Sequence, residues 1–249
     1  MQNVIATLVT AICGAMIAVA AIFVMTNMGY MPVNGPQIRN YLLSNPQVLN
    51  EMAAAAQRAE EVQQAAANEA MIKKVGLAAF FDPKIAFVTG PENAPNTMVE
   101  FYDYDCPFCR ASLPAVQKIL EQRKNDTRFA FIEFPLKELH GESAMMAARA
   151  SVAAARGQPD KFLAFHYLLM GQTEQITEEM VFAAAKEAGL DVARLRADMA
   201  RPEIAAAVEE SYAFAKKVGL DGTPTFIING KMYPGAMDEA GFAKAFAAK

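Results

Sequence analysis

The chain has 249 residues, 53% of them hydrophobic, and a formal net charge of −4 at pH 7. This length and composition allow one domain with a sizeable core plus an appended N-terminal segment. The acidic balance and the lack of a Lys/Arg cluster exclude nucleic acid as a partner, because binding to a phosphate backbone requires a concentrated positive face.

Residues 1–28 predict a transmembrane anchor. No side chain in residues 1–38 carries a charge, and residues 4–25 are nearly all apolar, which is long enough to cross a hydrocarbon core as a helix. A cleaved secretory signal is the alternative, but its positive n-region is missing and the apolar stretch is too long. The nearest Lys or Arg is Arg39, so loop charge leaves the orientation open.

Residues 29–82 predict a linker and a helical extension. Residues 29–36 hold glycine, asparagine and two prolines and predict a hinge. Asn45 as a cap and Pro46 in the first turn mark the start of a helix that runs to about Gly76. Small and apolar residues line up within it at Val48, Met52, Ala55, Ala59, Val62 and Ala66. This stripe favours self-association as much as a helix that lies on its own domain or a solvated spacer.

The pattern changes to strands after Lys84. Runs typical of strands occupy residues 85–88 and 97–102, separated by a turn rich in Pro, Asn and Gly. A helix that opens at Cys106 and a strand at residues 128–134 then complete a strand–helix–strand unit of the parallel type.

Residues 142–218 predict four or five helices and no strand. Their ends and starts are marked by glycines and by Pro or Thr: Gly157, Gly171, Gly189 and Gly219, and Pro159, Thr177 and Pro202. Strands at residues 225–228 and 231–233 then flank Asn229 and Gly230, a two-residue hairpin signature, and a last helix begins at Asp238. The sheet is therefore interrupted by helices and completed after them.

The cysteine motif Cys106-Pro107-Phe108-Cys109 stands at the predicted junction from strand to helix. Residues three apart on a helix share a face, so the two sulfurs can close and open a disulfide with little backbone movement. The unpaired N–H groups and the dipole of a helix N-terminus favour an anion, so Cys106 is expected to be the more acidic thiol and the nucleophile. Cys109, one turn inward, is expected to be the buried resolving thiol.

The same cysteine spacing also supplies half of a structural zinc site, which needs two more ligands. The sequence offers no second pair, because Cys13 lies in an apolar run and His140 and His166 are isolated. We interpret both histidines as structural or surface residues. We therefore expect no metal and no other cofactor.

A second motif, Gly222-Thr223-Pro224-Thr225-Phe226, precedes the first strand of the hairpin. A C-P-x-C motif between strand and helix, followed far downstream by G-T-P-T-F, resembles the thioredoxin superfamily, in which this proline is cis and faces the cysteines. Over residues 84–249 the chain resembles DsbA-like proteins of the bacterial envelope. It is most similar to the suppressor-of-copper-sensitivity C type, in which a helical N-terminal extension drives oligomerisation.

This resemblance implies an α/β thioredoxin fold over residues 83–249, with a helical insertion at about 142–218. It implies Cys106 as nucleophile, Cys109 as resolving thiol, Thr223 and Pro224 as the substrate-facing loop, and Glu100 as the acid beneath the active site. It further implies that the substrates are unfolded or misfolded envelope proteins and that a membrane redox partner recycles the cysteines.

Glu100 also interrupts an otherwise apolar strand six residues before Cys106. A carboxyl buried there is expensive to ionise and can relay a proton to Cys109. The alternative is the exposed face of an edge strand, because polar residues alternate at Glu100, Asp103 and Asp105.

The residue between the cysteines predicts a mild oxidant. Where the strongest oxidants of the family place a histidine, this chain has Phe108, which cannot stabilise a thiolate by charge. Asp103 and Asp105, if they lie near the sulfur, raise the pKa of Cys106. We therefore expect a weaker oxidant than the most oxidising members.

The favoured function is that of a thiol:disulfide oxidoreductase, as isomerase, reductase or mild oxidase. An oligomer with several reduced sites favours isomerisation, and a monomer kept oxidised by a membrane partner favours oxidation. The alternative is a non-catalytic envelope protein that binds Cu(I) or a client chain. Because disulfide exchange belongs on the oxidising side of a membrane, we expect a single-pass protein of the bacterial inner membrane with its catalytic domain in the periplasm.

Overall fold

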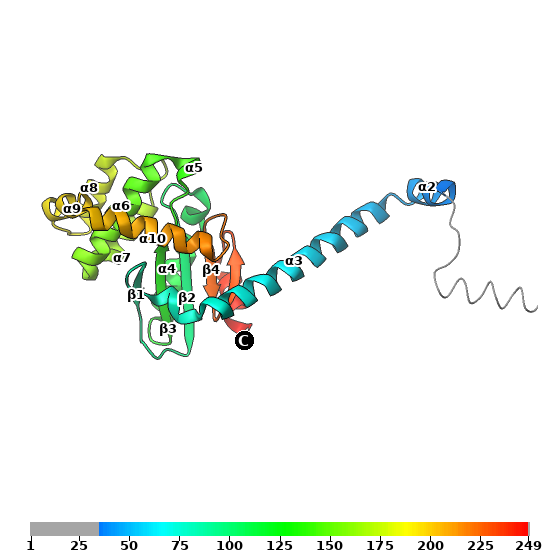
Figure 1. Cartoon of the computed structure of the whole chain (residues 1–249), viewed down its shortest axis with the longest axis horizontal. Helices are drawn as coiled ribbons and strands as arrows, with labels where there is room; N and C mark the ends of the chain where they lie inside the picture. Colours follow the sequence, from blue (N-terminus) through cyan, green and yellow to red (C-terminus); the bar gives the residue numbers. More distant parts are fainter. Residues whose placement is uncertain (1–34, 249) are drawn as a thin grey trace, which may run out of the picture. The chain divides into compact units, whose positions relative to one another are not determined.

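The computed structural model describes residues 35–248, which form the coloured part of Figure 1. The predicted anchor over residues 1–28 lies outside the described residues. Within residues 35–248, no helix is both long and apolar enough to span a bilayer. The chain divides into two units, residues 1–61 and 62–249.

The N-terminal unit contains helix α2 (Gly35–Ser44) and the first part of helix α3 (Gln47–Val75). Helix α3 follows the Asn45-Pro46 signal and ends just before Gly76, as predicted. The predicted hinge at residues 29–36 is wrong at its end, because α2 already begins at Gly35. Pro36 is compatible with this helix, since a first-turn residue needs no backbone N–H.

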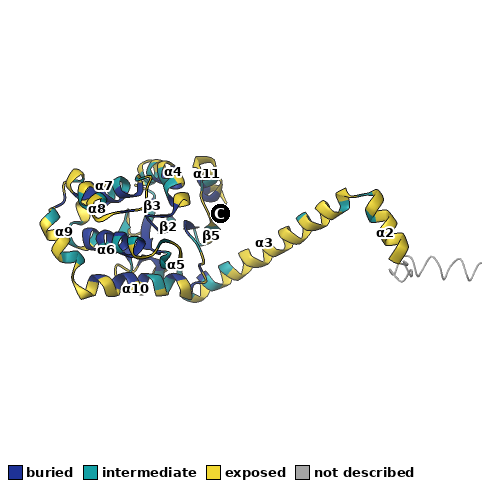
Figure 2. Cartoon of the chain, turned by 90° about the horizontal axis from the view of Figure 1, so that it is seen from above, coloured by how far each residue is buried: buried dark blue, intermediate teal, exposed yellow. Residues whose placement is uncertain are grey.

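Both helices expose apolar side chains. Helix α2 has no buried residue, and Ile72 is the one buried residue of α3 (Figure 2). Met52 and Val62 of the predicted stripe are 61% and 71% exposed. All three interpretations of the stripe therefore stay open: self-association, a helix that lies on its own domain, and a solvated spacer.

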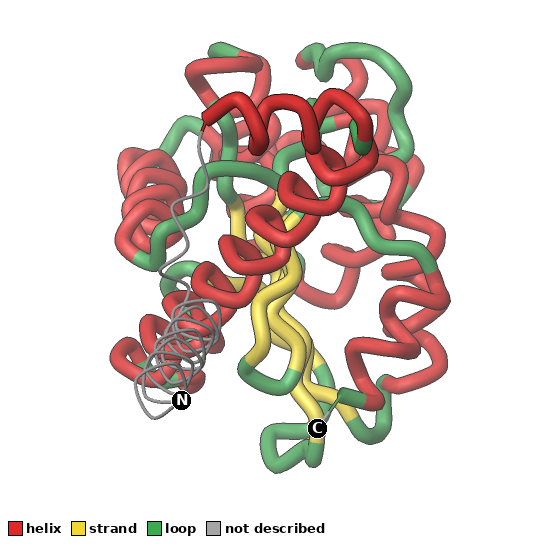
Figure 3. The backbone as a smooth tube through the Cα atoms, turned by 90° about the vertical axis from the view of Figure 1, so that its right-hand side faces the viewer, coloured by secondary structure: helices red, strands yellow, loops and turns green. Residues whose placement is uncertain are grey.

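The second unit is built on a five-stranded sheet in the order β1-β3-β2-β4-β5. The strands span β1 (Ala86–Thr89), β2 (Asn96–Tyr102), β3 (Thr127–Glu133), β4 (Thr225–Ile228) and β5 (Lys231–Pro234). β2 and β3 are parallel, as the strand–helix–strand pattern predicted, and the other pairs are antiparallel. β2 is the middle strand and leads directly to the cysteines. The sheet runs through the centre of the domain with helices on both sides (Figure 3).

Side chains alternate along β2 between two cores. Met98 and Tyr102 belong to the larger core, which also contains both cysteines of the motif, whereas Val99 and Phe101 belong to the core beneath Phe80 and Phe81. Glu100 is in register with the first pair. The alternation therefore directs its carboxyl to the face of the sheet that carries the cysteines.

The helices of the second unit begin and end close to the residues that were predicted to mark their ends. They comprise α4 (Pro107–Arg123), α6 (Glu142–Gly157), α7 (Pro159–Met170), α8 (Glu178–Glu187), α9 (Val192–Met199), α10 (Pro202–Lys217) and α11 (Glu239–Ala247). Five of them, α6 to α10, occupy the predicted insertion. Two short elements were not predicted, the 3-10 helix η1 (Leu77–Phe81) and helix α5 (Lys137–His140).

Close packing of the backbone requires a glycine directly after β1. Gly90, which follows β1, has a φ of 87°, and a Cβ atom there would lie 2.2 Å from the carbonyl oxygen of Thr127. A side chain at this position would have to displace backbone. Gly90 therefore fixes how closely the turn after β1 approaches β3.

Candidate active site

The cysteine pair lies at the start of α4, directly after β2 and a short loop. Cys106 is the N-cap residue, with φ −77° and ψ 118°, and Pro107 stands in the first turn, where its missing N–H is not needed. Both cysteines are free thiols and both are buried, with exposed fractions of 3% and 1%. Phe108 between them is 62% exposed. The structure therefore places the motif at a helix N-terminus, as predicted.

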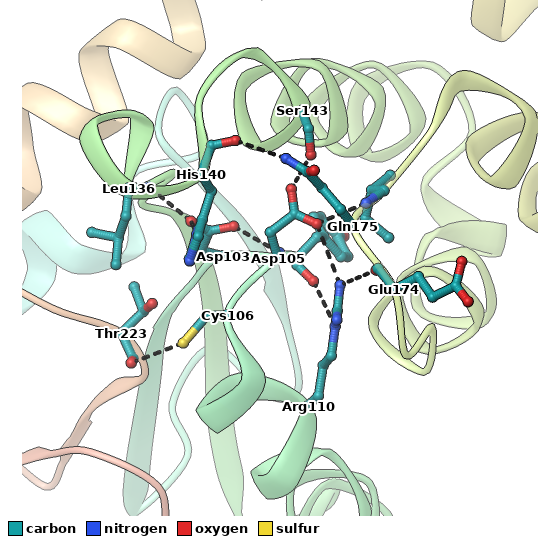
Figure 4. A network of polar contacts seen from close by, with 12 residues as sticks. Asp103, Asp105, Cys106, Arg110, Leu136, His140, Ser143, Glu174, Gln175 and Thr223 are labelled. Carbon is teal, nitrogen blue, oxygen red and sulfur yellow. Dashed lines mark hydrogen bonds and ion pairs between the residues drawn. The ribbon is translucent and has the colours of Figure 1, made fainter.

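The loop before β4 lies across from Cys106. The Thr223–Pro224 peptide bond is cis, and the Cys106 Sγ donates a hydrogen bond to the Thr223 carbonyl oxygen at 3.2 Å (Figure 4). The two residues are 117 positions apart in the sequence. The predicted cis bond and the predicted juxtaposition of this loop with the thiol are both confirmed.

The two thiols differ strongly in acidity. Hydrogen bonding from the Cys109 thiol, with further help from the backbone N–H groups of Cys109 and Phe108, lowers the pKa of Cys106 to about 6. Burial, and then the hydrogen bond with Cys106, raise the pKa of Cys109 well above its usual value. At neutral pH, Cys106 is therefore the thiolate and Cys109 the protonated partner.

Glu100 lies on the face of β2 that carries the cysteine pair. It is on the middle strand and only 3% exposed, and burial raises its pKa to about 8. Its charge also raises the pKa of Cys109, so the two groups are within electrostatic reach. The edge-strand alternative is wrong, because β2 has a neighbour on both sides. The Oε2 atom of Glu100 has no hydrogen-bond partner among the described residues.

The carboxylate of Asp103 accepts hydrogen bonds from three donors, none of which is the Cys106 thiol. Its carboxylate accepts hydrogen bonds from the backbone N–H of Asp105 at 2.8 Å and of Leu136 at 2.7 Å, and pairs with His140 Nδ1 at 2.8 Å. His140 comes from α5, the short helix that sequence reasoning missed. The histidine is thus structural, as predicted, but its partner was not foreseen.

Asp105 is similarly occupied (Figure 4). It pairs with Arg110 at 3.3 Å, accepts a hydrogen bond from the Ile176 backbone N–H at 2.7 Å, and also accepts one from the Ser143 hydroxyl. We expected the two aspartates, if they lay near the sulfur, to raise the pKa of Cys106 against the helix N-terminus, which lowers it. That pKa is instead lowered, and neither aspartate is among the groups that act on it most strongly.

A further buried polar cluster joins the loop before Cys106 to the helical insertion. The Tyr104 hydroxyl donates to Ser151 Oγ at 3.0 Å and contacts His166 Nδ1 at 2.9 Å. His166 is 1% exposed, and burial lowers its pKa to about 3, so it is neutral. It is a satisfied core residue, as predicted. Over residues 35–248, no group of three or more His, Cys, Asp or Glu side chains is placed to hold a metal ion.

Comparison with known families decides the classification. The family model described as thioredoxin matches residues 84–247, which is most of the chain. The chain belongs to the thioredoxin family. The predicted membership of the thioredoxin superfamily is confirmed, and the structural neighbours of the chain include ScsC and DsbA2 proteins.

Solved structures match this thioredoxin over most of their own length. A thioredoxin-like oxidoreductase from Silicibacter pomeroyi DSS-3 is 37% identical, with a TM-score of 0.59, over 68% of this chain and 93% of that one. ScsC from Proteus mirabilis, in a transitional conformation, is 26% identical, with a TM-score of 0.61, over 87% and 96%. BcfH from Salmonella enterica Typhimurium, 23% identical with a TM-score of 0.71 over 92% and 98%, shows the same fold.

Curated relatives carry a similar segment within a much longer protein. The Na(+)/H(+) antiporter NhaA 1 of Salinispora arenicola is 33% identical over 155 residues, which is 62% of this thioredoxin. NhaA 3 of Salinispora tropica is 31% identical over 154 residues. The chain spans about a quarter of the length of these relatives, 23% in both cases.

Proposed function

We propose that this thioredoxin is a thiol:disulfide oxidoreductase that exchanges disulfides with proteins of the bacterial envelope. The observation that carries the proposal is the position of Cys106 Sγ, at a helix start, 3.2 Å from the Thr223 carbonyl oxygen and beside the buried Cys109. A thiol with a pKa of about 6 is largely thiolate at neutral pH, and the thiolate is the attacking form.

The exchange proceeds in two steps. The Cys106 thiolate attacks one sulfur of a client disulfide, forms a mixed disulfide and releases the second client sulfur as a thiolate. Cys109 then loses its proton and attacks the Cys106 sulfur. The client leaves as a dithiol, reduced by two electrons, and Cys106 and Cys109 become a disulfide. The reverse sequence oxidises a client.

Glu100 and the cis-proline loop have separate roles in these steps. Glu100 is on the cysteine face of β2, and in its ionised form, which its pKa of about 8 leaves as a minor fraction at neutral pH, it can accept the proton that Cys109 loses when it resolves the intermediate. The backbone of Thr223 and Pro224 docks an extended client chain as an added strand. Because Cys106 is 3% exposed, the client must replace the Thr223 contact to reach the sulfur.

The residues around the Cys106 thiol bear on whether the protein oxidises, reduces or isomerises client disulfides. The exposed Phe108 brings no charge to the Cys106 thiolate, which favours an isomerase, a reductase or a mild oxidase over a strong oxidant. The apolar stripe on α3 supports a homo-oligomer, in which several dithiols serve one client. A membrane redox partner would return the pair to its working state.

We further propose a single-pass protein of the bacterial inner membrane with its catalytic domain in the periplasm. Support comes from the apolar, uncharged residues 1–28 and from the chemistry, since client disulfides persist on the oxidising side. A periplasmic thioredoxin-like protein from Salmonella enterica serovar Typhimurium is also 30% identical over 68% of the chain, with a TM-score of 0.55.

Insulin reduction by dithiothreitol tests the proposed activity. The wild-type chain should accelerate precipitation of the insulin B chain, Cys106→Ser should lose this activity, and Cys109→Ser should accumulate a mixed disulfide visible by non-reducing electrophoresis. Equal activity in Cys106→Ser would refute the exchange mechanism, and a wild-type chain without activity would favour a protein that binds clients or Cu(I) without turnover.

A further inference from the structure

A pocket of about 260 Å³ lies within the helical insertion, and none of the residues assigned to disulfide exchange lines it. Its lining comes from the end of α6, from α9 and from the start of α10, which lie together in Figure 1. Three arginines, Arg156, Arg194 and Arg201, share this pocket with two acids, Asp198 and Glu203. It is thus unusually rich in guanidinium groups.

The two acids leave one arginine without a carboxylate. Asp198 pairs with Arg194 at 3.5 Å and with Arg201 at 3.3 Å, and Glu203 accepts from Arg201 Nε at 2.7 Å. Arg156 donates to the Lys84 carbonyl oxygen at 2.7 Å and makes no ion pair in the described part of the chain. The pocket therefore retains one uncompensated positive charge.

The start of α10 adds backbone donors to the same place. Arg201 is the N-cap residue of this 16-residue helix, but its side chain makes no capping hydrogen bond to the first N–H groups. The Glu203 carboxylate instead accepts from its own backbone N–H and from Arg201. It occupies the position that an external oxyanion would take at such a helix start.

We propose that this pocket binds a phosphate group, with Glu203 as the internal carboxylate that the ligand displaces. Once Glu203 turns outward, three arginines against Asp198 leave two positive charges. Two charges match a phosphate dianion, whereas a single carboxylate would leave one charge uncompensated. The planar guanidinium forks of Arg156 and Arg201 suit the tetrahedral oxygens of phosphate, which they can contact in pairs.

The pocket also has the room that this ligand requires. Gly157 stands at its wall, where a Cβ atom would lie 2.8 Å from Asp198 Oδ2. The glycine thus leaves room for the Asp198 carboxylate that pairs with Arg194 and Arg201.

Line broadening of inorganic phosphate in ³¹P NMR, with the full-length chain at constant ionic strength, tests this site. Arg156→Gln should weaken phosphate binding about tenfold, the loss expected for one charged hydrogen-bond donor. Glu203→Gln should tighten binding several-fold, because the amide competes less well for Arg201. Vesicles that contain phosphatidic acid, compared with free phosphate, distinguish a lipid headgroup from a soluble ligand.

Arg128→Gln is the matched control, because Arg128 carries the same charge but stacks on Phe81 elsewhere in the domain. Equal weakening by Arg156→Gln and Arg128→Gln would show a diffuse charge effect and overturn the proposal. So would the absence of broadening with wild type, or weaker binding by Glu203→Gln. Insulin reduction should be unchanged in all three variants, so the outcome is independent of the proposed enzyme activity.

Discussion

At the scale of single residues, the acidity of the two thiols is set by their places in one helical turn. Cys106 faces N–H groups at the start of α4, and Cys109 lies beneath it in the core. We expect the alkylation rate of Cys106 by iodoacetamide to rise with pH around a midpoint of about 6, while Cys109 stays unmodified. Mass spectrometry of peptides after short exposures measures both rates. A midpoint near that of a free thiol, about 8.5, would contradict the assignment.

Glu100 should make stability depend on pH. A carboxyl whose pKa rises on folding, here from 4.5 to about 8, destabilises the folded chain increasingly between those pH values. At neutral pH this amounts to ~3 kcal/mol, because each pKa unit corresponds to about 1.4 kcal/mol.

Glu100→Gln should therefore raise the free energy of unfolding by a few kcal/mol at about pH 8 and leave it nearly unchanged at about pH 4. Denaturant unfolding of both proteins at the two pH values measures this difference. The same gain at both pH values would show that packing, not ionisation, is responsible. Because Glu100 is proposed to accept the proton of Cys109, the wild type should also resolve the mixed disulfide faster than Glu100→Gln.

The residues of the site differ in how far sequence reveals them. Cys106 and Pro224 belong to local motifs, and Glu100 stands out as one charge in an apolar strand, so all three were predicted. His140 was not connected with Asp103, because their contact joins a loop to a helix 37 positions downstream. Such pairs depend on tertiary packing, which a local pattern does not encode.

At the scale of elements, a buried hydrogen-bond cluster fastens the insertion to the sheet. The Tyr102 hydroxyl on β2 donates to Glu133 Oε1 at 2.5 Å and lies 3.1 Å from Ser151 Oγ on α6. Tyr102→Phe leaves the Glu133 oxygen without this donor, and a buried unpaired group costs about 1–3 kcal/mol. Urea unfolding should show this loss.

Tyr41→Phe is the control for that measurement, because Tyr41 is 60% exposed on α2 and exposed substitutions change stability by about 0.5 kcal/mol at most. Equal changes in the free energy of unfolding would mean that the buried Tyr102 hydroxyl contributes no more to stability than an exposed one.

Helices with strong end signals were predictable and short ones were not. The glycines, the prolines and Thr177 marked the ends of the four or five helices predicted in the insertion, where the structure has five, because such residues favour helix ends wherever they occur. Helix α5 has four residues and η1 has five. Both are too short to be stable alone, and η1 is held in place by its own Phe80 and Phe81, which are buried in the core that contains Val99 and Phe101 of β2.

At the scale of the whole molecule, the exposed stripe on α3 decides between monomer and oligomer. Light scattering in detergent should give a multiple of 27.0 kDa for the wild type. The double variant Met52→Glu/Val62→Glu should return the monomer mass without loss of stability, because both side chains are already exposed. Gln64→Glu adds charge to the same helix on the face opposite the stripe and should leave the mass unchanged. A wild-type monomer would remove the structural case for an isomerase.

Phe108 has a consequence for how such proteins diversify. Its ring is 62% exposed while the cysteines on either side are buried, so exchanging it disturbs no core contact. Phe108→His should therefore shift the equilibrium with glutathione toward the dithiol, as a nearby imidazolium stabilises the thiolate, at an almost unchanged melting temperature. The redox potential and the stability of this fold can consequently evolve separately, through single substitutions at this exposed position.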